Sequence, residues 1–316
     1  MSNSILTNAS AMTALQTLNA TNKSMEEVQN RISTGKRVSS AEDNAAYWSI
    51  ATTMKSDNAA LSAVQDALGL GAATVDTMYT AMNSTVDVVT EIKAKLVAAK
   101  QPGVDRSKIQ SDITELQNQL ASIADSAVFN SENWLSADTT AGGYNSVKNI
   151  VASFSRAGGS VTIETIDLDI SNTLLFDSGA QTGILDTDLT ADPIMTGLTG
   201  TNLTGNSVSD FDISALTDSA VDLADLDLVI AAVDQQLGAI TDAATNLGSV
   251  KTRVDLQKDF VDALTDALDR GIGQLVDADM NEESTRLKAL QVQQQLGIQA
   301  LSIANSSSDN ILSLFR

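Results

Sequence analysis

The residue types that most often carry out catalysis are missing from this sequence. It contains no histidine and no cysteine, which removes the commonest general base, the thiol nucleophile and the usual ligands of structural zinc. Glu282 and Glu283 are adjacent, but neighbouring residues on a helix point in different directions, so they make a poor acid–base pair. The sequence therefore predicts neither an enzyme nor a cofactor site.

One acidic stretch resembles a calcium-binding loop. Asp167, Asp169 and Ser171 have the spacing with which an EF-hand loop begins. However, Asn172 stands where that loop needs glycine, and Ser178 stands where it needs a glutamate that binds through both oxygens. The sequence therefore predicts no metal site here.

A pair of glycines resembles a phosphate-binding loop only superficially. Gly69 and Gly71 have the right spacing, but Thr74 replaces the third glycine. Both glycines also lie inside a run of apolar residues, from 61 to 96, that recur at alternating steps of three and four. This run predicts a long amphipathic helix that ends at a turn near Pro102.

The rest of the interior divides by pattern into helices and a β-rich segment. Residues 105–126 predict a helix antiparallel to the first, and residues 226–268 predict a second long helix. Glycines punctuate residues 129–178, and SVTIETIDLDI at 160–170 alternates as a strand does, which predicts β-structure. Residues 179–210 are rich in Gly, Thr, Asp, Ser and Asn and predict a loop-rich segment.

Both ends of the chain carry a stripe of apolar and polar residues at steps of three and four. The N-terminal stripe has one three-residue slip and comprises Ile5, Asn8, Met12, Leu15, Leu18, Asn22, Met25, Gln29 and Ile32. The C-terminal stripe comprises Leu287, Leu290, Gln294, Ile298, Leu301, Asn305, Ser308 and Leu312. Polar residues at such positions fix register and partner choice at a cost in stability, so we expect the two ends to pair conditionally.

Composition limits the possible partners. The net charge of −21 argues against binding to nucleic acid, because that binding depends on Lys and Arg. No apolar run reaches the roughly 20 residues that span a bilayer, and residues 1–10 do not resemble a secretory signal. Aromatic residues make up only 3%, so the core must be aliphatic.

Ser39 or Ser40, followed by Glu42 and Asp43, predicts a helix start capped by a hydroxyl.

The two ends of the chain resemble those of bacterial flagellin. The similar blocks are NKSMEEVQNRISTGKRVSSAEDNAAYWSIA at 22–51 and EESTRLKALQVQQQLGIQALSIANSSSDNILSLFR at 282–316. Between them, VFN at 128–130, TIETIDLDI at 162–170 and LGAI at 237–240 resemble internal flagellin patterns. The resemblance covers most of the chain outside the loop-rich segment.

The resemblance implies a mainly α fold of folded-back helical rods with paired N- and C-terminal helices and a small β-rich middle. Residues 1–40 and 280–316 would form the inner tube of the flagellar filament. Residues 41–178 and 211–279 would form the surrounding tube, and 179–210 a variable, surface-exposed segment.

The resemblance also implies which residues contact neighbouring subunits. Arg31, Ser39, Ser40, Asp43 and Asn44 would lie at the join of the two tubes. The full set of expected polymer contacts is Ile5, Met12, Leu15, Leu18, Met25, Arg31, Ser39, Ser40, Asp43, Asn44, Gln294, Leu296, Ile298, Leu301, Asn305, Ile311, Leu312, Leu314, Phe315 and Arg316.

By the same resemblance, the chain would assemble with itself, and with other flagellins, into an extracellular filament for swimming. Its other expected partners are the flagellar type III export apparatus, an export chaperone, and the hook–filament junction and cap proteins. The main alternative is that the chain is itself a hook–filament junction protein, an adaptor with similar terminal helices. An enzyme that uses flagellin-like ends as a scaffold would need a catalytic insert, and the middle lacks His and Cys.

Overall fold

The computed structural model describes residues 8–157, 160–188, 203, 205 and 207–313, and describes side chains as far as residue 306. Long helices dominate, with a small β-rich part between them, as the sequence predicts. Contacts divide the chain into two compact units. The first, called the terminal unit, comprises Met1–Ala59 and Leu264–Arg316, and the second, called the central unit, comprises Ala60–Ala263.

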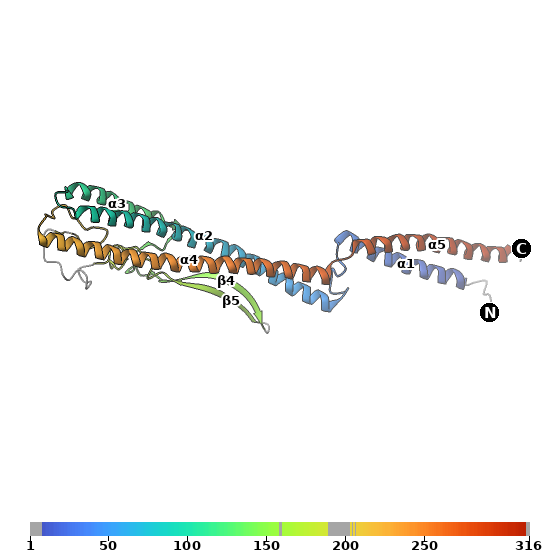
Figure 1. The fold of residues 1–316 in the computed structure, drawn as a ribbon. Helices are drawn as coiled ribbons and strands as arrows, with labels where there is room; N and C mark the ends of the chain where they lie inside the picture. Colours follow the sequence, from blue (N-terminus) through green and yellow to red (C-terminus); the bar gives the residue numbers. More distant parts are fainter. Residues whose placement is uncertain (1–7, 158–159, 189–202, 204, 206, 314–316) are drawn as a thin grey trace. The chain divides into compact units, whose positions relative to one another are not determined.

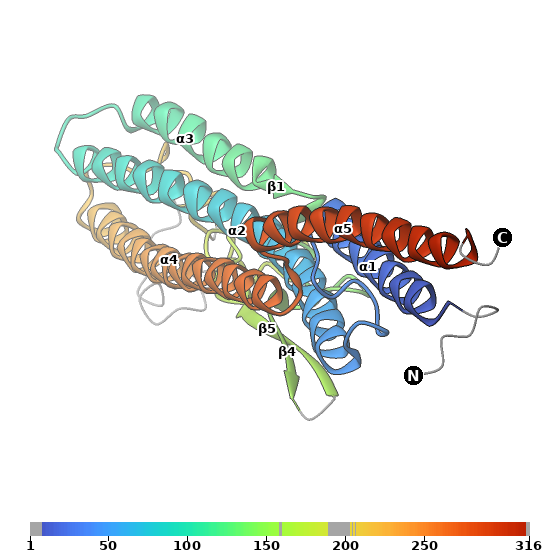
Figure 2. The ribbon, with the colours of Figure 1, turned by 90° about the vertical axis from the view of Figure 1, so that its right-hand side faces the viewer.

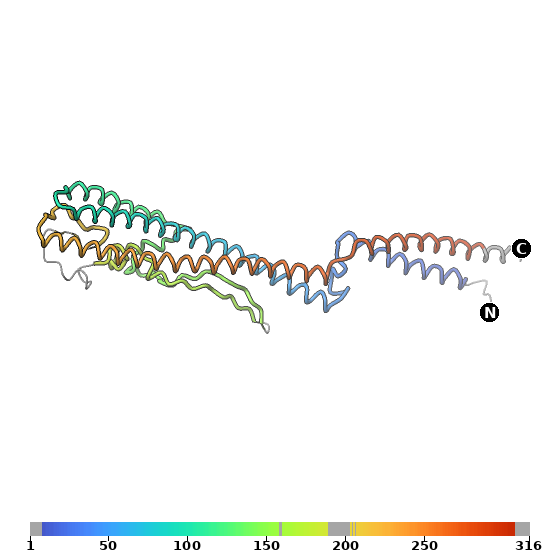
Figure 3. The backbone as a smooth tube through the Cα atoms, viewed as in Figure 1, coloured from blue at the N-terminus to red at the C-terminus, as the bar shows by residue number. Residues whose placement is uncertain are grey.

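In the terminal unit, helix α1 (Ala9–Thr34) lies beside helix α5 (Met280–Ser313) and runs in the opposite direction (Figures 1 and 3). The Asn8 side chain accepts a hydrogen bond from the backbone N–H of Ala11 and so caps the start of α1. The helix ends at Gly35, whose φ of 69° is a left-handed conformation that glycine adopts without strain. These local signals set the length of α1.

The central unit contains most of helices α2 (Ala45–Ala99) and α4 (Ala220–Val276) and all of helix α3 (Arg106–Ser126), which pack side by side (Figure 2). The turn between α2 and α3 contains Gly103 with a φ of 81°, and the two helices lie side by side in opposite directions (Figure 2), which confirms the predicted helical hairpin. Fully buried aliphatic residues form the core, among them Leu68, Met78, Met82, Ile92, Leu96, Ile113, Leu120, Leu226, Val233, Ile240 and Leu247.

Strands β4 (Val147–Ala157) and β5 (Ser160–Asp169) form an antiparallel hairpin, which confirms the predicted β-structure. The register is irregular between Val151 and Ser153. Two further pairs are short. Strands β1 (Val128–Phe129) and β2 (Glu132–Asn133) are antiparallel, and β3 (Ser136–Ala137) and β6 (Phe176–Asp177) are parallel.

The β4–β5 hairpin packs on α2 at a glycine. A Cβ atom placed on Gly71 would lie only 2.4 Å from Cγ2 of Ile150 in β4, whereas one placed on Gly69 would meet nothing within 4 Å. Both glycines lie within α2, as the helical repeat predicts. Gly71 therefore serves close packing between helix and hairpin.

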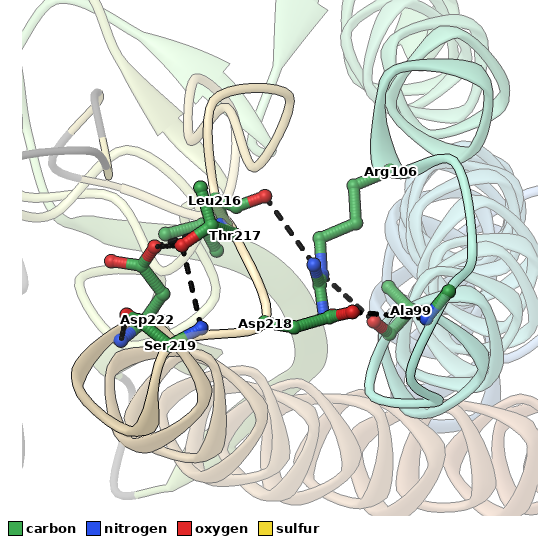
Figure 4. Close-up of polar contacts among 8 residues, drawn as sticks. Ala99, Arg106, Leu216, Thr217, Asp218, Ser219 and Asp222 are labelled. Atoms are coloured by element: carbon green, nitrogen blue, oxygen red, sulfur yellow. Dashed lines mark hydrogen bonds and ion pairs between the residues drawn. The ribbon is translucent and has the colours of Figure 1, made fainter.

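A buried arginine ties the irregular segment before α4 to the α2–α3 turn (Figure 4). Arg106 is 5% exposed and donates to the carbonyl of Ala99 at 3.0 Å, to that of Leu216 at 3.4 Å and to a carboxylate oxygen of Asp218 at 2.8 Å. The other Asp218 oxygen accepts from the N–H of Gly103 at 3.0 Å. The Arg106 hydrogen bond, followed by that from Gly103, holds the pKa of Asp218 below its ordinary value.

Candidate functional site

Polar side chains bridge α1 and α5 along their length. Near one end of the pair, the Asn8 amide donates to the carbonyl of Ala304 at 2.9 Å. Gln294 donates to the side-chain oxygen of Asn22 at 2.8 Å, so these two predicted stripe residues meet. Near the other end, Arg31 forms an ion pair with Glu283 at 3.2 Å. Such contacts make the alignment of the two helices specific.

The residues that face inward between α1 and α5 differ in part from the predicted stripes. On α1 the more protected positions run through Ala11, Ala14, Leu18, Thr21, Met25 and Val28. They continue at steps of three and four, so the predicted three-residue slip is wrong. Met12 and Leu15 are 62% and 49% exposed and lie outside this stripe. Ala11, Ala14 and Thr21 are small and allow the helices to approach closely, whereas Leu18, Met25 and Val28 fill the other inward positions.

The C-terminal stripe needs a similar correction. Gln294 and Leu301 lie at partly protected positions, as predicted. Ile298 is 54% exposed and Asn305 is also exposed, and the preceding residues Gly297 and Ala304 are the more protected ones. A Cβ placed on Gly297 would lie 3.3 Å from a methyl group of Leu18 in α1. A glycine at this position therefore allows the close approach of the two helices.

Large apolar side chains remain on the outside of the pair. We call these the outer apolar set: Met12, Leu15, Val292, Leu296, Ile298 and Ile303. Each member is at least 49% exposed, whereas Val28 is the only buried residue among the described side chains of α1. The pair thus buries little apolar surface by itself, and amphipathic helices owe most of their stability to such burial. This surface is suited to packing against another molecule.

The segment after α1 contacts the end of α4 within the terminal unit. The backbone N–H groups of Arg37 and Val38 donate to the carbonyl of Val276 at 2.6 and 3.2 Å, and the N–H of Ala278 donates to the carbonyl of Gly35 at 3.0 Å. The Arg37 guanidinium also donates to two carbonyls in the last turn of α4. These bonds satisfy carbonyls that a helix end leaves unpaired. The sequence did not single out Arg37. The only feature that could have drawn attention to it was its basic charge close to Gly35.

The serine and acidic motif forms a compact turn around Asp43. One oxygen of Asp43 accepts from the N–H groups of Ser39 and Ser40 at 2.8 and 3.0 Å, and also from their hydroxyls. The pKa of Asp43 lies below its ordinary value, first because of the Ser40 backbone bond and then because of those from Ser39. The predicted hydroxyl cap is wrong. Asn44 caps α2 by accepting from Ala46 and Tyr47, because its side chain immediately precedes the helix.

The remaining predicted contact residues lie beyond what the structure describes. Ile5, Leu314, Phe315 and Arg316 are outside the described residues, and the side chains of Ile311 and Leu312 in α5 are outside the described side chains. Most of the predicted variable segment, 189–202, is outside them as well.

Neither a metal cluster nor a membrane span is found in the described part of the chain. No group of three or more metal-ligating residues lies close enough together there to hold an ion. Among the described helices, none is long and apolar enough to cross a bilayer. The distinctive features of the site are the polar contacts between α1 and α5, the outer apolar set and the turn around Asp43.

Comparison with known proteins gives matches at both ends and along the whole chain. A family model of the bacterial flagellin N-terminal helical region matches residues 5–140, and one of the C-terminal helical region matches residues 230–315. Flagellin C of Rhizobium meliloti (strain 1021) is 52% identical, with 99% of each chain covered. Flagellin A of Rhizobium meliloti is 46% identical, covering 99% of this chain and 100% of that one, and flagellin of Brucella melitensis is 46% identical, covering 99% of each.

Proposed function

Because this chain belongs to the bacterial flagellin family, whose members are structural subunits of the extracellular flagellar filament and not enzymes, we propose that its copies contact one another there through α1 and α5. The filament serves swimming motility, and subunits of other flagellins can share it. The named relatives are flagellins, so the alternative of a hook–filament junction adaptor is not favoured.

The outer apolar set is the observation that carries this proposal. A helix pair that leaves Met12, Leu296 and Ile298 about half exposed or more gains stability when a second copy covers them. Subunits that repeat head to tail by a rotation that does not close produce an open helical filament. We infer that pairing of α1 with α5 and assembly of the filament stabilise each other.

The same proposal assigns parts of the chain to parts of the filament. Residues 1–40 and 280–316 form the inner tube, and 41–178 and 211–279 form the surrounding tube. Residues 179–210 lie on the outer surface. Support comes from the family models, which match the two ends and leave 141–229 between them. The alignment with flagellin A spans 400 positions, more than the 316 residues of this chain, so the family tolerates changes of length.

The connector residues have a distinct proposed role. Arg31, Ser39, Ser40, Asp43 and Asn44 form the join between the two tubes. The hydrogen bonds that Asp43 accepts from Ser39 and Ser40 give this turn a defined shape, which supports a role in fixing the connection between the two tubes. Ile5, Leu18, Met25, Gln294, Leu301 and Asn305, together with Ile311, Leu312, Leu314, Phe315 and Arg316, complete the proposed polymer contacts.

The remaining partners follow from the family. We propose that the chain leaves the cell as an unfolded polypeptide through the flagellar type III export apparatus, after an export chaperone has held its C-terminus. The absence of cysteine is compatible with this passage, because no disulfide can form on the way. The junction protein and the cap protein would then contact the filament at its two ends.

Substitutions in the outer apolar set test the proposal. Replacing both Leu296 and Ile298 by serine removes apolar surface but leaves the α1–α5 seam intact. The matched control replaces the exposed neighbours Gln295 and Gln299 by serine. We expect the control to assemble like the unmodified chain, as followed by light scattering, and the apolar variant to assemble at least tenfold more slowly, with the same monomer circular dichroism. Equal assembly of the two variants would refute the proposed role of this surface.

A further inference from the structure

The apolar seam between α2 and α4 does not by itself define how the helices align. In the central unit, buried apolar residues of both helices recur at steps of three and four, as in a heptad repeat. They include Leu68, Val75, Met78 and Met82 on α2, and Ile240, Leu247, Val250 and Val254 on α4. If α4 were displaced by seven residues, apolar side chains would again meet apolar ones. Other residues must distinguish the observed alignment from the displaced ones.

Polar pairs on the flanks of the seam all share one alignment. Gln65 hydrogen-bonds to Asp262, and Lys93 pairs with Asp234. Lys100 pairs with Asp227 at 2.6 Å. From each pair to the next, the residue number rises on α2 by the same amount as it falls on α4. Flanking pairs of this kind specify register in helical pairs, although exposed ones contribute little to stability.

The centre of this series contains a contact based on size as well as charge. The ring of Tyr79 packs over Gly248, where an added Cβ would lie 3.3 Å from a ring carbon. Lys251 places its amine 5.8 Å from the centre of the same ring and forms an ion pair with Asp76. Gly238, also in α4, has nothing within 4 Å of such a Cβ and does not take part.

We propose that Asp76, Tyr79, Gly248 and Lys251, which we call the register block, are the specificity-determining residues that align α2 with α4. The block combines a large ring opposite a residue without a side chain with a lysine opposite an aspartate. Only in the observed alignment does the Tyr79 ring lie opposite a glycine while Asp76 lies opposite a lysine. This role is independent of the proposed assembly through α1 and α5.

Displacement by seven residues would break the block in either direction. Moved one way, Tyr79 would face Asp255, and moved the other way it would face Thr241. Both residues carry a side chain where Gly248 leaves room for the ring. Displacement toward Thr241 would also leave Asp76 opposite Ala244, without a cation, whereas displacement toward Asp255 would bring Lys258 opposite Asp76, so there the Tyr79–Gly248 contact alone discriminates. The block thus disfavours both neighbouring alignments.

The Arg106 contacts form a second constraint at the end of the same helices. They connect the last turn of α2 to Asp218, just before α4 begins. The register block is therefore tested in a chain that lacks this constraint. The Arg106→Ala substitution removes it while leaving the block unchanged.

Disulfide formation between introduced cysteines can report the alignment, because the full-length chain has no cysteine of its own. Val86 and Thr241 line one cavity of about 210 Å³, so Val86→Cys with Thr241→Cys reports the observed alignment. Lys93→Cys with Thr241→Cys reports displacement in one direction, and Val86→Cys with Asp234→Cys reports it in the other. Both displaced reporters remove only the Lys93–Asp234 pair, so they are matched to each other.

Gly248→Leu places a large side chain against Tyr79, and Gly238→Leu is its control in the same helix. In the Arg106→Ala background we expect Gly248→Leu to lower the observed-alignment crosslink at least threefold and to produce one displaced crosslink. We expect Tyr79→Ala to restore the first crosslink. Arg106→Ala alone and Gly238→Leu should keep the observed alignment. An unchanged crosslink in Gly248→Leu, a displaced crosslink with Arg106→Ala alone, or a loss of all crosslinks that Tyr79→Ala does not reverse would each overturn the proposal.

Discussion

The packing of β4 on α2 makes a quantitative prediction for two glycines in one helix. In an exposed helix interior, Gly→Ala stabilises by about 1 kcal/mol, because alanine has the higher helix propensity. Gly69→Ala should show this gain, since nothing lies within 4 Å of the new methyl group. At Gly71 the same methyl would lie 2.4 Å from Cγ2 of Ile150, a methyl group bonded directly to Cβ that can move away only by rotation about χ1 or by a shift of the strand.

The difference between the two variants isolates the cost of the clash, because the gain in propensity is common to both. Overpacking of a well-packed core costs about 1–3 kcal/mol. We therefore expect Gly71→Ala to be less stable than Gly69→Ala by about 1–3 kcal/mol in urea unfolding of the full chain, followed by circular dichroism. Ile150→Ala removes the clashing methyl, so adding Gly71→Ala to that variant should cost less stability than adding it to the unmodified chain. If Gly71→Ala is as stable as Gly69→Ala, the close packing of the hairpin on α2 is wrong.

Three further outcomes follow from the polar contacts. Arg106→Met should destabilise the central unit by about 2–3 kcal/mol, because it removes charged hydrogen bonds and leaves buried carbonyls unpaired; no change in the urea midpoint would contradict this. Asn44→Ala should cost about 1 kcal/mol through loss of the α2 cap, whereas Asn44→Asp should retain the cap, and thermal unfolding compares the two. Because the folded-state pKa of Asp43 is lowered, its contribution to stability is present above its ordinary value of 3.8 and is lost as the pH falls through the folded value. Substituting both Ser39 and Ser40 by alanine should raise this pKa only partly in an NMR titration, because the backbone N–H bonds remain.

Long, regular repeats allowed the central helices to be predicted well. The repeat on residues 61–96 marks residues that α2 buries, such as Met78 and Ile92. A helix with one strongly apolar face has few alternatives, so sequence and structure agree there. The start of α2 at Ala45 was less evident, because residues 45–50 are all exposed and carry no buried stripe.

The terminal pair was harder to predict, for a physical reason. A search for apolar periodicity favours large side chains such as Met12, Leu15 and Ile298. The inward positions include small residues such as Ala14 and Gly297, which let the helices approach, beside larger ones such as Leu18. Large apolar residues on the outside of a pair belong to a surface that a single chain does not complete. The exposure of Met12, Leu15 and Ile298 is therefore consistent with a helix pair built for a further partner.

Contacts between distant segments could not be predicted from local pattern. The bonds from Arg37 to the last turn of α4 join residues far apart in the sequence. The same holds for Arg106, which looks like an ordinary first-turn arginine yet is buried against Leu216 and Asp218. Periodicity describes one helix at a time, so such tertiary polar contacts remain hidden until the fold is known.

Whether the terminal helices drive polymerisation can be tested by comparing assembly of the full-length chain with that of a chain ending at Ala300. The shorter chain retains Gln294 and most of α5 but lacks residues 301–316. Light scattering and negative-stain electron microscopy would follow both. We expect filaments from the full-length chain only, because the paired terminal helices drive assembly. Filaments from both chains would contradict that claim.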